Sequence, residues 1–149
     1  MLIQFANPPS HIIKTQAEKI LNHSSGWKAL TGTTDFAEIA VENPPTQNHQ
    51  LAFDIVVDRI LGYIGSYFLK LDGKVDALVF AGGVAENSAM LRKKLVEHSQ
   101  ALGFAIDESA NSKGANKQQS VTDVSRDSGK VPRVLICRTD EQVECKLSF

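Results

Sequence analysis

The sequence predicts an α/β fold in which a buried strand is enclosed by helices, and three observations support this class. Residues 77–81 form an apolar run with β-branched and aromatic members, typical of a strand buried on both faces of a parallel sheet. Across 48–71, apolar residues recur at three- and four-residue steps, the spacing of one broad helical face. A second apolar run at 131–137 predicts another strand. We expect a sheet covered by helices, with ligands at the carboxyl ends of its strands.

Composition limits the classes of function. A length of 149 residues fits one domain with its own core. Lys and Arg number 16 against 17 Asp and Glu, so the net charge of −1 does not favour nucleic acid as a partner. Cys137 and Cys145 have no second pair and no histidine at ligand spacing, which disfavours a zinc site or a disulfide framework. Because no apolar run reaches the ~20 residues of a membrane span, we expect a cytoplasmic protein that inserts into no membrane.

The N-terminal third is predicted to contain two helices. Ser10 is a suitable N-cap for a helix over 11–21, and Gly26 supplies a left-handed residue to end it. Residues 27–34 are expected to form a short connector with small side chains that leave room for a ligand. Asp35 then begins a short helix, either as a simple helix cap or as a ligand-binding residue.

The long helix follows the proline pair Pro44 and Pro45, which bars a helix through itself. Its predicted range is 48–71. Gly62 and Gly65 lie inside that range, and each costs ~1 kcal/mol relative to alanine. Close packing against a sheet or a partner helix would explain them.

Two glycines separate the central strand from the next predicted helix, at 85–94. Gly82 and Gly83 allow a positive φ and a close approach of the backbone to a ligand. The free N–H groups of the following helical turn suit an anionic or polar ligand, although a strand-to-helix turn without a ligand is the alternative. Val84 and Asn87 stand where the dinucleotide-binding fingerprint needs glycine, so that fingerprint is excluded.

The C-terminal third is less regular. Gly103 is expected to stop the helix, and 104–106 is short and apolar enough for an edge strand. Residues 107–130 are polar, and we expect partial disorder between 111 and 119. Thr139 opens a last short helix.

Residues 80–88, Phe-Ala-Gly-Gly-Val-Ala-Glu-Asn-Ser, resemble the adenosine-binding turn of acetate kinases. Residues 30–36 and 134–141 match further segments of that family in the same order. The resemblance covers about 17–145 and only the C-terminal part of such an enzyme. It implies that 1–149 is a single, incomplete lobe of the ribonuclease-H-like or actin-like kind, with a mixed sheet flanked by helices.

The resemblance also implies a site. It places Mg²⁺ at Glu141 and the adenine and ribose of ADP or ATP near Asp35, Phe36, Gly82, Gly83, Val84 and Asn87. These residue types suit a nucleoside, because glycine permits close approach, valine offers an apolar surface and asparagine has both donors and an acceptor. A carboxylate at Glu141 suits Mg²⁺.

Two departures from the family pattern weaken this match. Ala37 stands where the family commonly has an arginine that contacts the nucleotide, and Arg138-Thr139-Asp140-Glu141-Gln142 replaces Pro-Thr-Asn-Glu-Glu. The family's catalytic arginines, histidine and aspartate belong to segments that precede the matched part. We therefore assign no catalytic residue to this chain, and none of its histidines matches the missing one by motif.

The leading hypothesis is the ADP- or ATP-binding C-terminal lobe of an acetate kinase, which transfers phosphate reversibly between ATP and acetate to give acetyl phosphate and ADP. Acetate or another short carboxylate would bind through the missing lobe, and a propionate or butyrate kinase relative is an alternative. We expect a homodimer or larger assembly. The hypothesis of another class is a non-catalytic fragment that binds nucleotide or self-associates. The mass of the native polypeptide would distinguish the enzyme from the fragment.

Overall fold

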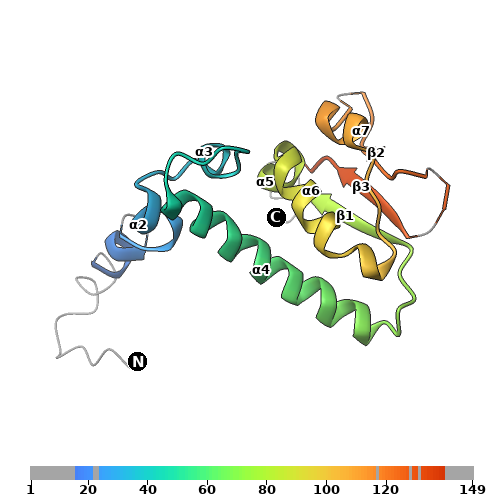
Figure 1. Cartoon of the computed structure of the whole chain (residues 1–149), viewed down its shortest axis with the longest axis horizontal. Coiled ribbons are helices and arrows are strands. Elements are labelled where there is room, and N and C mark those ends of the chain that lie inside the picture. The colour runs from blue at the N-terminus through green and yellow to red at the C-terminus, as the bar shows by residue number, and fades with distance from the viewer. Residues whose placement is uncertain (1–15, 22–23, 117, 128, 131, 140–149) are drawn as a thin grey trace, which may run out of the picture.

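The computed structural model describes residues 16–21, 24–116, 118–127, 129–130 and 132–139 (Figure 1). Residues 16–21 are helical, so the predicted helix over 11–21 lies partly outside the described residues. The predicted last helix after Thr139, together with Glu141 and Cys145, lies wholly outside them. The remaining elements, in chain order, are α2 (Gly26–Thr31), α3 (Phe36–Ile39), α4 (Gln47–Lys70), β1 (Ala77–Ala81), α5 (Gly83–Asn87), α6 (Ala89–His98), the 3-10 helix η1 (Gln100–Leu102), α7 (Glu108–Lys113), β2 (Val121–Asp123) and β3 (Arg133–Cys137).

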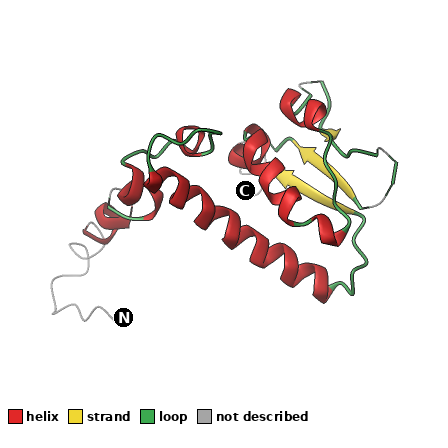
Figure 2. Cartoon of the chain, viewed as in Figure 1, coloured by secondary structure: helices red, strands yellow, loops and turns green. Residues whose placement is uncertain are grey.

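The described strands form one mixed sheet with the order β1-β3-β2. β1 pairs in parallel with β3, from Ala77 opposite Arg133 to Ala81 opposite Cys137. β2 pairs antiparallel with β3. α5 contacts both β1 and β3, and α6 contacts α4 (Figure 2). The α/β class and the mixed sheet flanked by helices are thus confirmed.

The burial of β1 differs from the sequence-based prediction. Phe80 is buried, but Val79 is 52% exposed, so β1 is not covered on both faces. In β3, Val134 and Ile136 are buried and alternate with more exposed neighbours, the pattern of a sheet covered on one face. Because β1 is apolar throughout and one of its faces is open, the described residues leave apolar sheet surface uncovered.

The long helix α4 runs from the region of α2 and α3 to the region of the sheet (Figure 1). Its N-terminal half packs against α2 and α3, where Phe36 lies with its ring centroid 5.4 Å from that of Trp27 and 6.2 Å from that of Phe53. Its observed bounds agree with the predicted 48–71. None of the helices in the described part of the chain is both long and apolar enough to cross a membrane.

The C-terminal half of α4 is less covered than its pattern predicts. Tyr67 and Leu71 belong to the apolar face of this helix, yet they are 59% and 53% exposed. A Cβ added at Gly62 or Gly65 would meet nothing within 4 Å. The close packing expected at these glycines is therefore not supplied by the described residues.

The connector predicted over 27–34 is wrong, because most of it forms α2. Gly26 has the expected positive φ of 61°, but it is the first residue of α2 and does not cap the preceding helix. Gly32, with a φ of 82°, ends α2 through an N–H bond to the Lys28 carbonyl. The left-handed glycine that ends a helix in this region is therefore Gly32, at the end of α2, and not Gly26.

The single helix predicted over 85–94 is two helices. Ser88 has an extended conformation, ends α5 and begins α6. Its hydroxyl oxygen accepts a hydrogen bond from the Leu91 N–H at 3.2 Å, the usual role of an N-cap serine. The chain therefore bends at Ser88, directly after the predicted site residue Asn87.

The polar segment 107–130 also differs from expectation. Its first part forms α7, because the Asp107 carboxylate accepts from the Ala110 N–H at 2.7 Å and caps the helix. Asn111, at the start of the range for which we expected disorder, is 3% exposed. The predicted edge strand at 104–106 reduces to a single bridge between Ile106 and Ser125.

Candidate functional site

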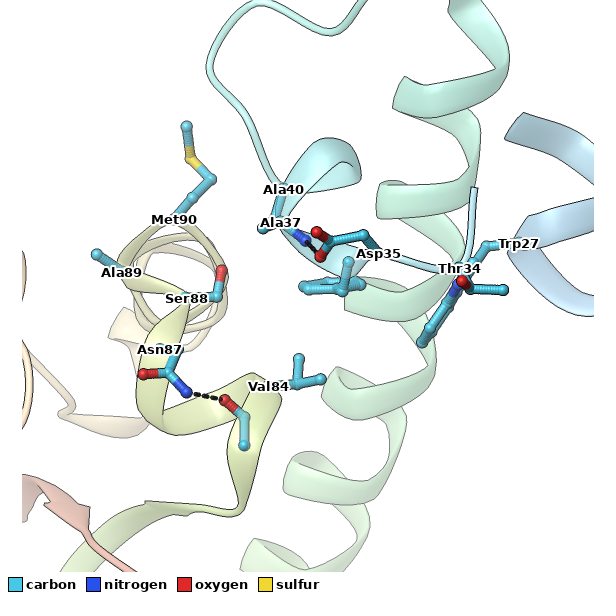
Figure 3. A pocket seen from close by; sticks show the side chains of 12 residues that line it. Trp27, Thr34, Asp35, Ala37, Ala40, Val84, Asn87, Ser88, Ala89 and Met90 are labelled. Carbon is cyan, nitrogen blue, oxygen red and sulfur yellow. Dashed lines mark hydrogen bonds between the residues drawn. The ribbon is translucent and has the colours of Figure 1, made fainter. Parts of the chain in front are cut away.

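A cavity of about 580 Å³ lies between α3 and the junction of α5 with α6 (Figure 3). It contains five of the six residues that the sequence singled out for nucleotide binding, and the sixth, Gly82, is the N-cap of α5. Two segments about a third of the chain apart thus form one concave surface. The lining residues are Trp27, Thr34, Asp35, Phe36, Ala37, Ala40, Gly83, Val84, Asn87, Ser88, Ala89 and Met90.

The α3 wall is organised by Asp35. One of its carboxylate oxygens accepts a hydrogen bond from the Ala37 N–H at 2.8 Å, which satisfies a free donor in the first turn of α3. The Asp35 N–H in turn donates to the Thr33 hydroxyl at 3.0 Å. Phe36 is only 6% exposed, so most of its ring belongs to the aromatic core. The helix-cap role of Asp35 is therefore present and leaves the exposed side chain at the cavity.

The α5 wall follows from the glycine turn. Gly82 has a φ of 81°, a region that side chains with a Cβ rarely adopt. At Gly83, a Cβ would meet nothing within 4 Å, so its surface is open to a ligand. Val84 is 43% exposed and extends into the space between the two walls (Figure 3).

Asn87 is held in place by its own helix. Its Nδ2 donates to the Gly83 carbonyl at 2.7 Å (Figure 3). An asparagine amide has a second N–H and a carbonyl oxygen, and these are the groups that Asn87 can offer to the cavity. Together with Val84, it gives this wall one apolar and one hydrogen-bonding surface.

Sequence reasoning gave no role to Glu86, which ties this wall to β3. Its Oε1 accepts from the Gly82 N–H at 3.0 Å, and from the Thr139 N–H and hydroxyl at 2.9 Å each. The Thr139 backbone bond is the main cause that holds the Glu86 pKa below its ordinary value of 4.5. The resulting stabilisation is complete above the unfolded-state pKa and is lost as the pH falls through the lower folded-state value.

Arg92 is buried, although charged side chains on a helix usually lie in water. It is 1% exposed, and its guanidinium donates to the carbonyls of Ala85 and Glu86 at 2.6 and 2.7 Å. It also donates to Oδ1 and to the backbone carbonyl of Asn111 at 2.7 and 2.9 Å. Because Asn111 lies 19 residues away, no local pattern could have identified this pairing.

The expected anion site at the glycine turn is weaker than predicted. The Gly82 N–H is bonded to Glu86, and α5 has only five residues, so its dipole is shorter than that of one long helix. The cavity walls combine apolar and hydrogen-bonding side chains. This character favours the nucleoside part of a nucleotide over its phosphates.

The described residues form no metal centre. Within them, no group of three or more His, Cys, Asp or Glu side chains is placed to hold a metal ion. Glu141, the predicted magnesium residue, lies outside them. Among the described residues, Asp35 is the one that supplies a carboxylate to the cavity wall, and the magnesium assignment stays a prediction.

A mixed sheet flanked by helices, with a cavity at the ends of its strands, defines this chain as part of an α/β protein with an actin-like fold. Residues 2–146 match the Acetokinase family, and the chain belongs to that family. The relatives include "Probable acetate kinase" of Emericella nidulans, 58% identical over 130 residues that make up 86% of this chain and 31% of the relative. "Probable acetate kinase" of Neurospora crassa is 43% identical, over 87% of this chain and 33% of the relative.

Solved structures agree. An acetate kinase from Entamoeba histolytica superposes with a TM-score of 0.72 and 25% identity, covering 93% of this chain and 38% of that one. A propionate kinase from Francisella tularensis gives a TM-score of 0.68 and 28% identity, covering 93% and 36%. The chain thus spans about a third of the length of the curated relatives that it matches.

Proposed function

We propose that this chain is the nucleotide-binding, C-terminal lobe of an acetate kinase and that its cavity holds the adenosine of ADP or ATP. The observation that supports this most directly is the meeting of Asp35 and Phe36 with Gly83, Val84 and Asn87 around one cavity. Its volume of about 580 Å³ lies within the range of small-molecule sites. The purine would lie against Val84, and Asn87 would hydrogen-bond the nucleoside.

In the complete enzyme, we propose reversible transfer of a phosphoryl group between ATP and a short carboxylate, giving ADP and an acyl phosphate. Mg²⁺, held with the help of Glu141, would neutralise phosphate charge. Acetate is the acceptor that most relatives' names indicate, whereas one structural neighbour is a propionate kinase. The acceptor pocket would lie in segments of the complete enzyme outside the part matched here. We propose a cytoplasmic location for the enzyme.

The glycine turn supplies the first test. Gly83→Val should abolish ADP binding, because the added side chain would fill space that the nucleoside needs. A Cβ at this position meets no protein atom within 4 Å, so the fold should tolerate the change. Asn87→Ala should weaken binding by ~1–3 kcal/mol, the cost of unpairing polar groups. Titration calorimetry with ADP measures both effects.

Matched controls exist on α4. Gly62→Val makes the same change at another helical glycine with open space around it, and Asn48→Ala removes an exposed amide outside the cavity. Both should bind ADP like the unaltered chain. If Gly83→Val and Asn87→Ala also keep full affinity, the turn is not part of the site.

We also propose that this lobe self-associates through the C-terminal half of α4. Tyr63 and Tyr67 are stacked with centroids 6.5 Å apart and are 61% and 59% exposed, and Leu71, which lines the same groove, is 53% exposed. Exposed apolar groups that adjoin one another are typical of an interface.

Sedimentation velocity should therefore show a dimer or larger species. The double variant Tyr63→Lys, Tyr67→Lys should sediment as a monomer, because it places charge on the apolar surface. Gln47→Lys adds one positive charge at the other end of α4 and should leave the association unchanged. A monomeric unaltered chain at high concentration would contradict the proposal.

A further inference from the structure

We propose that Glu86 is a positioning residue, which fixes the glycine turn beneath the nucleoside relative to the chain that leaves β3 at Thr139. The inference rests on the proposed nucleotide site. It holds that Glu86, which is not among the residues lining the cavity, keeps the lining residues of α5 in place. A single carboxylate oxygen accepts three hydrogen bonds from two segments 53 residues apart. Glu86 thereby connects the two parallel strands just beyond their carboxyl ends.

The topology explains why such a connection is needed. β1 and β3 are paired only up to Ala81 and Cys137. Beyond these residues the two segments are no longer paired with each other. The Gly82 and Thr139 N–H groups would otherwise lack the sheet partners that their neighbours have. Because Oε1 of Glu86 accepts from both N–H groups, this one atom sets the distance between the two segments. Hydrogen bonds to an ionised acceptor are stronger than those between neutral groups.

The short helix α5 makes the carboxylate important to the cavity. A five-residue helix has no stability of its own, because nucleating a helical turn is unfavourable. Glu86 bonds the Gly82 N–H at its start, while Arg92 donates to the Ala85 and Glu86 carbonyls at its end. Val84 and Asn87 are carried by this helix, so their positions depend on how its start is held.

The same carboxylate also determines where the following segment begins. Thr139 stands two residues before Glu141, the predicted magnesium residue. By bonding both the N–H and the hydroxyl of Thr139, Glu86 sets the direction in which the chain departs from β3. Glu86 therefore links the adenosine wall to Thr139.

The test compares Glu86→Ala with Glu86→Gln in the 149-residue chain. NMR hydrogen exchange should be at least about tenfold faster at the Gly82 and Thr139 amides in Glu86→Ala, because each loses one hydrogen bond. The ADP dissociation constant, from calorimetry well below the unfolding temperature, should rise about tenfold. Glu86→Gln keeps an acceptor oxygen in the same place. Its amide exchange and ADP affinity should therefore stay close to those of the unaltered chain. Thr139→Val removes only the hydroxyl bond and should give a smaller change.

Glu97→Ala is the matched control, since it removes an exposed carboxylate that pairs with Lys94 on α6. It should leave both amides and the ADP affinity unchanged. Unaltered exchange at Thr139 in Glu86→Ala would overturn the connection itself. ADP binding at full affinity by Glu86→Ala would overturn the positioning role. No ADP binding by the unaltered chain would instead overturn the proposed function and, with it, this role, whatever the exchange rates.

Discussion

The 149 residues, purified alone, should bind ADP or MgATP weakly and form no acetyl phosphate from ATP and acetate. The cavity residues proposed to contact adenosine are present, but by family resemblance the charge-stabilising residues and the acceptor pocket belong to preceding segments. Positioning and electrostatic stabilisation supply most of what a protein adds to phosphoryl transfer. Their joint loss should lower the rate by many orders of magnitude and not by a modest factor.

Hydroxamate trapping of acetyl phosphate measures this directly, with a full-length acetate kinase as the positive control. Calorimetric binding of ADP to the same preparation shows that the lobe is folded and competent to bind. Rapid acetyl phosphate formation by the 149 residues would show that this lobe carries catalytic groups. Mixing the chain with the missing part of a relative tests whether the deficit lies in those segments.

Local sequence patterns predicted much of the fold, and the reason is visible in particular elements. The apolar spacing of α4 and the apolar runs of β1 and β3 depend on neighbours within a few residues, so their existence and approximate bounds could be predicted. The turn at Gly82 requires a positive φ, which glycine signals in any context. Five site residues could be grouped only through the family resemblance, and the cavity now brings them together.

What the sequence did not reveal depends on partners far along the chain. Glu86 reads as an ordinary helical glutamate until Thr139 is placed beside it. Arg92 follows a helical pattern that puts charged residues in water, yet Asn111 and two carbonyls of α5 supply acceptors for a buried guanidinium. The exposure of Val79 was also unpredictable, because an apolar strand does not show which of its faces the chain at hand can cover.

Arg92→Met should cause the largest loss of stability of any single change considered. Arg92 is 1% exposed, and its guanidinium is the donor to four carbonyl oxygens on α5 and Asn111. Methionine fills a similar volume but donates nothing, so these buried acceptors lose their partner. A buried polar group left without a partner costs ~1–3 kcal/mol. Four acceptors lose their donor together, so the loss should be a large fraction of the ~5–15 kcal/mol that stabilises a typical domain.

Urea unfolding followed by circular dichroism measures this loss, and the neighbouring residue gives the control. Lys93→Met makes the same substitution at an exposed ion pair with Glu108, and its unfolding midpoint should stay near that of the unaltered chain. Arg92→Lys retains three donors and should fall between the two. If Arg92→Met does not fold, Asn111→Ala, which leaves the Ala85 and Glu86 carbonyls bonded to Arg92, should still show a lowered midpoint. Equal midpoints for Arg92→Met and Lys93→Met would mean that α5 is held by its sheet contacts and not by the buried guanidinium.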